Sequence, residues 1–193
     1  MKAVITLLFV VLTSIQMLSQ DSRISVELSY PLPAGDNFIQ RSYNGIVDAG
    51  VKVRFFDVGS FRFGMAFNTT VLVNKNEVDT RPLTVNITAF GLQPKAFAEL
   101  NSPFLVGFRP NVGLGYSFFV FSIESDALGD FGTAIENETQ RGVNFHLGLA
   151  YDFTERFFLQ VQYDFTKLNV ENIPDIPFNS DVNLFKIGVG YNI

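Results

Sequence analysis

The chain has 193 residues, of which 47% are hydrophobic and only 17% charged, and its formal net charge is −5. An ordinary soluble surface needs about 25% charged residues, so the composition argues against a plain soluble domain, and the acidic balance argues against nucleic acid as a partner. There is no cysteine, which excludes disulfides and a lipid anchor on cysteine.

The first predicted element is a signal peptide over residues 1–19. Lys2 precedes an apolar stretch, and small and polar residues follow up to Ser19. One basic residue, roughly ten apolar residues and a small residue at the end are typical of secretory signals, whereas a spanning helix needs about twenty apolar residues. We place cleavage before Gln20, which leaves residues 20–193 as one domain. An uncleaved membrane anchor is the alternative.

An alternation of two residue classes follows the signal peptide. From Phe104 to Tyr116 every second residue is bulky and apolar, and the residues between them are mostly small or polar. Successive side chains of a strand point to opposite faces, so each such segment predicts a strand with one apolar face. Most segments exceed the usual globular strand of about five or six residues. The eight predicted strands are residues 23–30, 46–56, 61–73, 83–100, 104–121, 143–153, 157–166 and 183–193.

The connections between these strands alternate in length. Three are short, namely residues 57–60, 101–103 and 154–156. Four are long, namely residues 31–45, 74–82, 122–142 and 167–182. All short connections fall at the end of the sheet that holds both termini. Outer-membrane barrels have this asymmetry, with short periplasmic turns and long external loops, so we expect both termini in the periplasm.

Charged residues within the predicted strands keep to the polar face. They are Arg23, Glu27, Asp48, Lys52, Arg54, Arg62, Lys95, Glu99, Arg109, Asp152, Asp164 and Lys186. The same face is rich in glycine and alanine, as suits the narrow lumen of an eight-stranded barrel. The opposite face is rich in phenylalanine, which would overfill such a lumen. The alternative is a soluble barrel with its apolar face inward.

The sequence therefore predicts an all-β fold: an eight-stranded, antiparallel, up-and-down transmembrane barrel with its apolar face toward lipid. Every backbone polar group needs a partner in lipid, so we expect the first and last strands to pair. We expect Phe104 and Phe108 to contact lipid, and Gly107 to leave space in the lumen beside Arg109. An eight-stranded lumen is filled by side chains, so the charges are expected to pair as a plug.

The C-terminus resembles the β-signal that outer-membrane proteins present to the barrel-assembly machinery. Lys186, Gly188, Tyr191 and Ile193 fit this pattern in order, although phenylalanine is commonest at the last position. Residues 110–117 also resemble the glycine-rich fifth strand of small OmpA/OmpX-like barrels.

The resemblance implies membrane lipid, lipopolysaccharide and the assembly machinery as partners, and no cofactor. Richness in phenylalanine, absence of tryptophan and Gln20 just after the signal resemble Bacteroidetes-type members of the family.

Three hypotheses remain for function. The leading one is a non-enzymatic envelope protein that acts structurally or through surface interactions of its external loops. The second is an accessory subunit of an envelope complex, such as a secretion apparatus. The third is a lipid-modifying enzyme that uses the single histidine, His146, as a general base, with Ser117 on the neighbouring strand. A structural histidine in the lumen is the simpler interpretation of His146.

Two kinds of loop feature remain open in the sequence. The segment 122–142 is acidic and carries Glu124, Asp126, Asp130, Glu136 and Glu138 against Arg141. It either binds cations or a cationic partner, or is simply solvated, and it lacks the spacing of a calcium loop. Apolar residues at 31–35 and 172–178 either serve a partner or fold over the barrel mouth.

Overall fold

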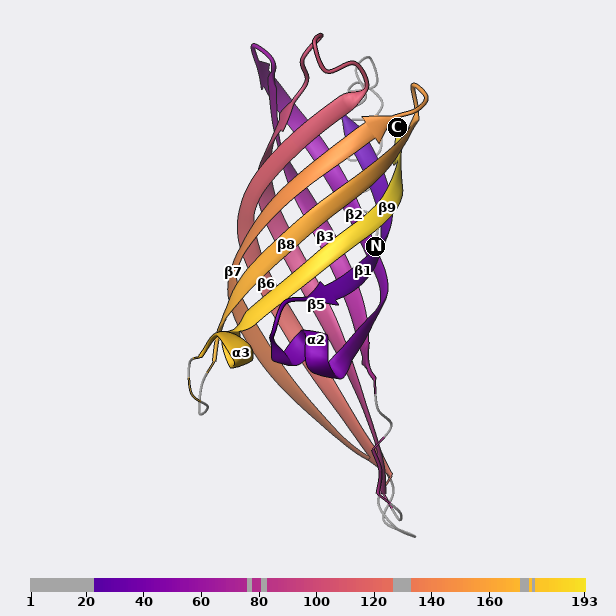
Figure 1. Ribbon diagram of the computed structural model, residues 1–193, viewed down its shortest axis with the longest axis vertical. Coiled ribbons are helices and arrows are strands. Elements are labelled where there is room, and N and C mark those ends of the chain that lie inside the picture. The colour runs from indigo at the N-terminus through magenta and orange to yellow at the C-terminus, as the bar shows by residue number, and fades with distance from the viewer. Residues whose placement is uncertain (1–22, 76–77, 81–82, 127–132, 171–173, 175) are drawn as a thin grey trace, which may run out of the picture.

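The computed structural model describes residues 23–75, 78–80, 83–126, 133–170, 174 and 176–193, and the predicted signal peptide lies outside them. The strands form a tall barrel (Figure 1). They are β1 (Ile24–Ala34), β2 (Tyr43–Val58), β3 (Phe61–Asn74), β4 (Val78–Thr80), β5 (Leu83–Leu100), β6 (Phe108–Asp126), β7 (Thr133–Asp152), β8 (Phe157–Asn169) and β9 (Asp181–Asn192). The helices α2 (Phe38–Ser42) and α3 (Pro177–Ser180) are short. No helix among the described residues is long and apolar enough to cross a membrane.

The sheet closes on itself. Each barrel strand pairs with its neighbour in antiparallel register, and β1 pairs with β9 from Ser25↔Asn192 to Ala34↔Asn183. The short β4 pairs with β5 alone and lies outside the ring, which is completed by the pairing of β3 with β5. Eight strands therefore form the closed barrel, and the predicted fold class and closure are confirmed.

The predicted strand over residues 104–121 starts too early. Residues 104–107 belong to the turn between β5 and β6, and β6 begins at Phe108. Gly107 has φ +78° and packs near the Tyr151 ring, so it is a turn residue and not a spacer in the lumen. Phe104 is likewise a turn residue. The misassignment arose because an apolar turn continued the alternation of the strand that follows it.

All four long predicted loops contain regular structure: segment 74–82 holds β4, segment 167–182 holds α3, and the other two differ most from the prediction. In the segment 122–142, β6 continues to Asp126 and β7 starts at Thr133, with pairs such as Ser122↔Asn137 between them. In the segment 31–45, β1 continues to Ala34 and α2 begins at Phe38, after Asn37 accepts a hydrogen bond from the backbone N–H of Gln40. Both differences lie at the same end of the barrel.

The apolar face points outward, as predicted. Leu28, Met65, Leu114 and Leu147 are among the exposed outward residues at mid-barrel. At the turn end, aromatic side chains form a girdle that is typical of barrels at a membrane interface. Its ring contacts are Phe108–Tyr151, Phe153–Phe157 and Phe157–Tyr191. A register shift in β2 between Arg54 and Phe56 places both Phe55 and Phe56 outside.

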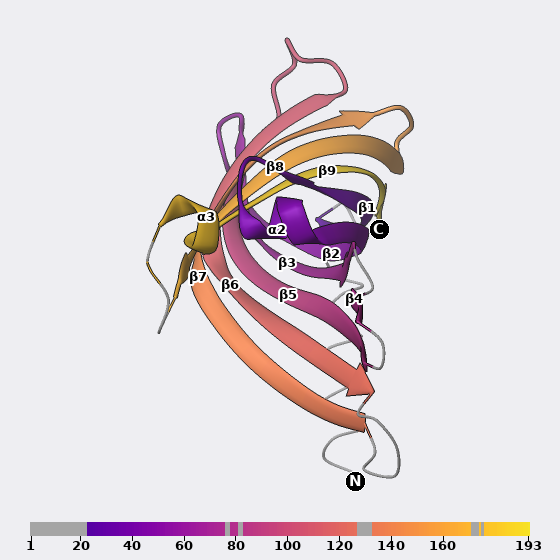
Figure 2. The ribbon, with the colours of Figure 1, turned by 60° about the horizontal axis from the view of Figure 1, so that its bottom comes forward.

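The interior has a polar part and an apolar part. At the loop end the inward-facing positions become apolar, and α2 lies within the ring of strands (Figure 2). We call this group the apolar cap. Its buried members are Ile39, Tyr43, Leu72, Ala89, Phe119, Phe121, Leu168, Val182 and Leu184. The lumen is therefore not polar throughout, because apolar residues also occupy the inward phase of the strands near the loops.

Candidate functional site

The centre of the lumen holds a cluster built around Lys186 of β9. Its Nζ lies 2.6 Å from Asp48 Oδ2 on β2 and 2.7 Å from Asp164 Oδ2 on β8. Lys95 of β5 reaches the same Asp164 oxygen at 2.8 Å. Lys186 also donates to Gln93 Oε1 at 3.1 Å. All four charged side chains are buried, so the cluster ties four strands together across the barrel.

A second cluster lies nearer the turns and centres on Glu99 of β5. Arg54 of β2 makes two bonds to its carboxylate, at 2.9 and 3.0 Å. Arg109 of β6 approaches the same carboxylate at 3.2 Å and donates to Asp152 Oδ1 at 2.7 Å. The Arg109 guanidinium also lies 4.9 Å from the centre of the Phe158 ring. Forked arginine–carboxylate bonds of this kind combine geometric specificity with strength.

One further ion pair lies in the lumen beside the two clusters. Lys52 Nζ of β2 lies 2.7 Å from Glu27 Oε1 of β1, and both side chains are buried. With the two clusters, five cations and five anions pair with one another. Buried charge is tolerated when it is paired and hydrogen-bonded. We call these ten residues the lumen network, and its arrangement suits a plug that joins the walls.

The other two predicted lumen charges lie at the turn-side rim. Arg23 is only partly buried, and its guanidinium donates to the backbone oxygen of Phe55 at 3.3 Å. Arg62 is also partly exposed and lies 3.8 Å from Asp57 in the β2–β3 hairpin. Arg62 lies in β3, as predicted, whereas Arg23 directly precedes β1. The alternation of residue classes does not predict how far a residue lies from the end of the barrel.

His146 lies inside the barrel and is fully buried. Its Nε2 is 3.1 Å from Asn111 Oδ1, and its ring packs over Gly113 of β6. Ser117 pairs in register with Gly142, four positions from His146 along β7, which is about 13 Å of strand. Ser117 instead interacts with Gln93 and Thr166. The structure therefore does not bring the histidine and the serine together.

The residues of the predicted assembly signal lie along β9 and just after it. Lys186 belongs to the lumen network, and Gly188 lies against Ser29 of β1, where a Cβ would meet the serine oxygen. Tyr191 faces outward in the girdle and accepts a hydrogen bond from Arg156. The backbone N–H of Ile193 donates to the oxygen of Ile24. The same residues thus help to close the barrel.

A projecting sheet extends from the loop end of the barrel. It consists of the ends of β5, β6 and β7 with β4, and in Figure 1 it runs well past α2 and α3. Pairing of β6 with β7 continues to Asp126↔Thr133, whereas pairing of β7 with β8 stops at Arg141↔Asn169. Among the described residues, 133–140 of β7 therefore have no partner strand on their second edge. No group of three or more metal-ligating side chains occurs in the described part of the chain.

The apolar cap is the feature that sequence reasoning missed. A signal for it was present, because Leu72, Phe119 and Leu184 stand in the same phase as the lumen charges. The inward-facing positions of the strands that carry them are charged or polar at the centre and apolar toward the loops, and this change is visible in the sequence. The five-residue α2 offers no helical periodicity, although Asn37 at its start is a favoured N-cap residue.

Comparison with known proteins identifies the same architecture. A family model described as "outer membrane protein beta-barrel domain" matches residues 5–192. Neisserial surface protein A has a TM-score of 0.57 at 14% identity, with 88% of this chain and 96% of that chain covered. Ail of Yersinia pestis has a TM-score of 0.53 at 14% identity, with coverages of 87% and 95%. No curated protein matches. These likenesses confirm the resemblance to small outer-membrane barrels and show the fold alone.

Proposed function

The chain belongs to the family of outer-membrane protein beta-barrel domains, and on this premise we propose that it is a non-enzymatic surface-interaction protein that works through its projecting sheet. The observation that carries the proposal is the edge of β7 over residues 133–140, which pairs with no further strand in the described part of the chain. An exposed strand edge is a template for an added strand from a partner. The self-paired lumen network, by contrast, leaves little room for transport.

The proposal requires that the loop end faces outward and the turns and termini face the periplasm. Short periplasmic turns and long external loops are the rule for bacterial barrels. The test is an epitope inserted into the segment 127–132 or, separately, at Gly59 in the β2–β3 turn. We expect intact cells to be stained only for the first insertion, with the second detected after permeabilisation. Staining in the reverse pattern would overturn the orientation.

The charge of the projecting sheet indicates the chemistry of its partner. The sequence of segment 122–142 carries five acidic residues and one arginine, so an extended basic polypeptide is the partner that we propose. Ail of Yersinia pestis has been solved with a heparin analogue, sucrose octasulfate. That ligand is anionic, and the acidic segment here disfavours an equivalent one.

The binding experiment removes the projecting hairpin and keeps the barrel. Because Ser122 pairs with Asn137, residues 123–136 can be replaced by Asn-Gly, a dipeptide suited to a tight hairpin. The probe is a labelled decapeptide of alternating lysine and threonine, with a glutamate–threonine peptide as control. We expect the intact barrel to bind the basic peptide and the shortened barrel to bind it at least tenfold more weakly. Equal binding by both would reject the projecting sheet as the site.

One feature favours a second candidate, the accessory subunit of an envelope complex. In the β5–β6 turn Phe104 is 93% exposed and Val106 is 83% exposed. Such apolar residues at a turn are typical of a protein contact. Affinity capture of the full chain from its own envelope, compared with the Phe104→Ser, Val106→Ser variant, tests this. A stable partner lost in the variant would support it, and no partner with either chain would reject it.

The enzyme hypothesis has no support from the geometry of His146. The ring is buried and separate from Ser117, so it offers no base to a lipid at the outer rim. We expect His146→Ala to leave the lipid A profile of the cells unchanged, as mass spectrometry would show. A changed profile with a folded barrel would restore the hypothesis. Membrane lipid, lipopolysaccharide and the assembly machinery remain the partners that we propose for the barrel itself.

A further inference from the structure

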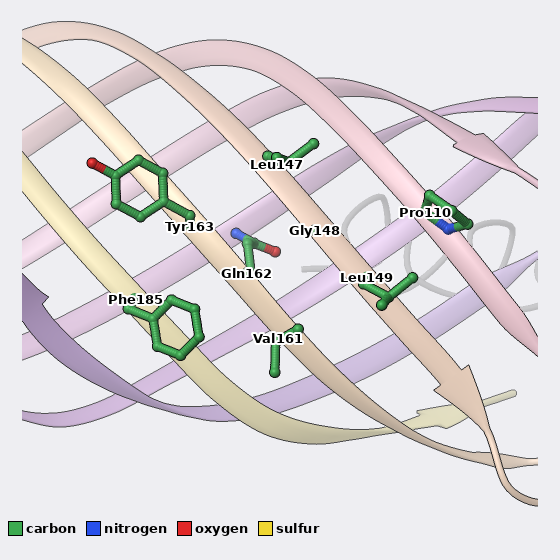
Figure 3. A pocket seen from close by; sticks show the side chains of 8 residues that line it. All are labelled: Pro110, Leu147, Gly148, Leu149, Val161, Gln162, Tyr163 and Phe185. Carbon is green, nitrogen blue, oxygen red and sulfur yellow. The ribbon is translucent and has the colours of Figure 1, made fainter.

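An apolar groove crosses the outer wall of the barrel over β6, β7, β8 and β9 (Figure 3). Its volume is about 330 Å³, near the lower limit of small-molecule sites, which span roughly 300–1,000 Å³. The residues that line it include no charged side chain. The groove lies halfway along the strands, within the outward apolar face.

The strand register fixes the two walls of the groove. Leu149 of β7 and Val161 of β8 are paired and form the wall nearer the turns. Leu147 pairs with Tyr163, and Tyr163 pairs with Phe185 of β9, to form the wall nearer the loops. Residues two apart on a strand are about 7 Å apart, which leaves a furrow between the walls. Figure 3 shows these side chains on either side of it.

The floor of the furrow is backbone, and its turn-side wall is low. Gly148 and Gln162, which are paired, form the floor, and the Gln162 amide turns inward to donate to Asp164 at 2.6 Å. On β6 the turn-side wall continues as Pro110, a compact ring. The outward side chains next to the groove are larger and aromatic. On the loop side Phe145 pairs with Phe165, and on the turn side Tyr151 packs on Phe108.

The loop-side edge of the groove carries its one polar anchor. The Tyr163 hydroxyl donates to Asn183 Oδ1 at 2.8 Å on the outer surface. Tyrosine is suited to a position where one end is apolar and the other polar. The groove is thus apolar at mid-membrane and polar toward one leaflet, which is the profile of a lipid molecule.

We propose that this groove binds one acyl chain of a membrane lipid, which enters from the loop-side leaflet past Tyr163. We infer an acyl chain as the occupant because the groove is continuous with the outward apolar face, which faces the acyl chains of the bilayer. Side chains of the two walls hold the chain laterally, so this lipid exchanges more slowly than its neighbours.

The test fills the groove and counts the lipids that stay bound. Val161→Phe adds a ring to the low wall, and Val51→Phe on β2 is the matched control, because the two valines are 40% and 42% exposed. The full barrel is purified with a synthetic saturated phosphatidylethanolamine and analysed by native mass spectrometry during stepwise detergent exchange. We expect one lipid to persist on the parent and on Val51→Phe, and its retained fraction to fall at least tenfold with Val161→Phe.

A second variant and its control test the same groove if Val161→Phe does not fold. Leu147→Phe fills the groove from the opposite wall, and Leu114→Phe on β6 is its control at similar exposure. Heat-modifiable gel mobility checks that every variant is folded. Retention that is equal in groove and control variants, or no retained lipid on the parent, would overturn the proposal. So would a dimer of the parent that Val161→Phe dissolves, since the occupant would then be a second copy.

Discussion

At the scale of single residues, the interior depends on a few shared groups. Lys186 holds two carboxylates, Asp48 and Asp164, that come from different strands. Glu99 does the reverse and holds two arginines. The removal of a shared group therefore leaves like charges buried next to each other, which is costlier than the loss of one exposed ion pair.

Replacement of Lys186 by methionine tests this dependence. We expect the free energy of unfolding to fall by about 3–5 kcal/mol, the usual cost of breaking a buried pair, measured by urea titration in detergent micelles. Lys186→Met combined with Asp48→Asn should recover most of the loss, since Asp164 keeps Lys95. The control Lys167→Met affects a half-exposed pair with Asp181 and should cost about 1 kcal/mol or less. Similar losses in both single variants would refute the argument.

At the scale of elements, the loop end has a cap that the barrel ladder does not require. The helix α2 places Ile39 among apolar side chains of β3, β6 and β9. Asn37 fixes its entry, because its side chain donates to the backbone oxygen of Ala34 at 2.8 Å and accepts the N-cap hydrogen bond from the backbone N–H of Gln40. Because α2 makes no strand pairs, it can open without breaking the barrel.

The Ile39→Ala variant should release the cap and spare the barrel. Deletion of a buried isoleucine typically costs about 2–5 kcal/mol, and here the loss should appear as faster amide exchange of α2, with unchanged exchange in β7 and β8. Arg41→Ala, at an exposed position, is the control and should change exchange little. Global unfolding of Ile39→Ala would instead show that the cap is part of the barrel's cooperative unit.

At the scale of the whole molecule, the alternation predicted the strand faces and hence the lumen network. It could not predict which charges meet, since Lys186 and Asp48 become neighbours only when the register of the closed barrel is fixed. It failed at Phe104, where an apolar turn imitates a strand. It also missed α2, because five residues are too few for helical periodicity.

The filled interior also predicts the electrical behaviour of the molecule. Eight strands enclose little more than their own side chains, and here the lumen network and the apolar cap occupy successive levels. We expect the purified barrel to give no steady conductance in planar bilayers. Stable, ion-selective conductance steps at neutral pH would show that the network opens a path.

The position of Lys186 in the last strand has a consequence for the order of events during biogenesis. Asp48 and Asp164 belong to β2 and β8, so both precede their shared cation in the chain. Until β9 arrives, the two carboxylates face a lumen that lacks this counter-ion, and dehydration of that lumen is unfavourable. The strand that joins both ends of the sheet also delivers the missing charge. We therefore expect the interior to lose its water only when β9 closes the barrel, and the lumen of an unfinished chain to stay hydrated.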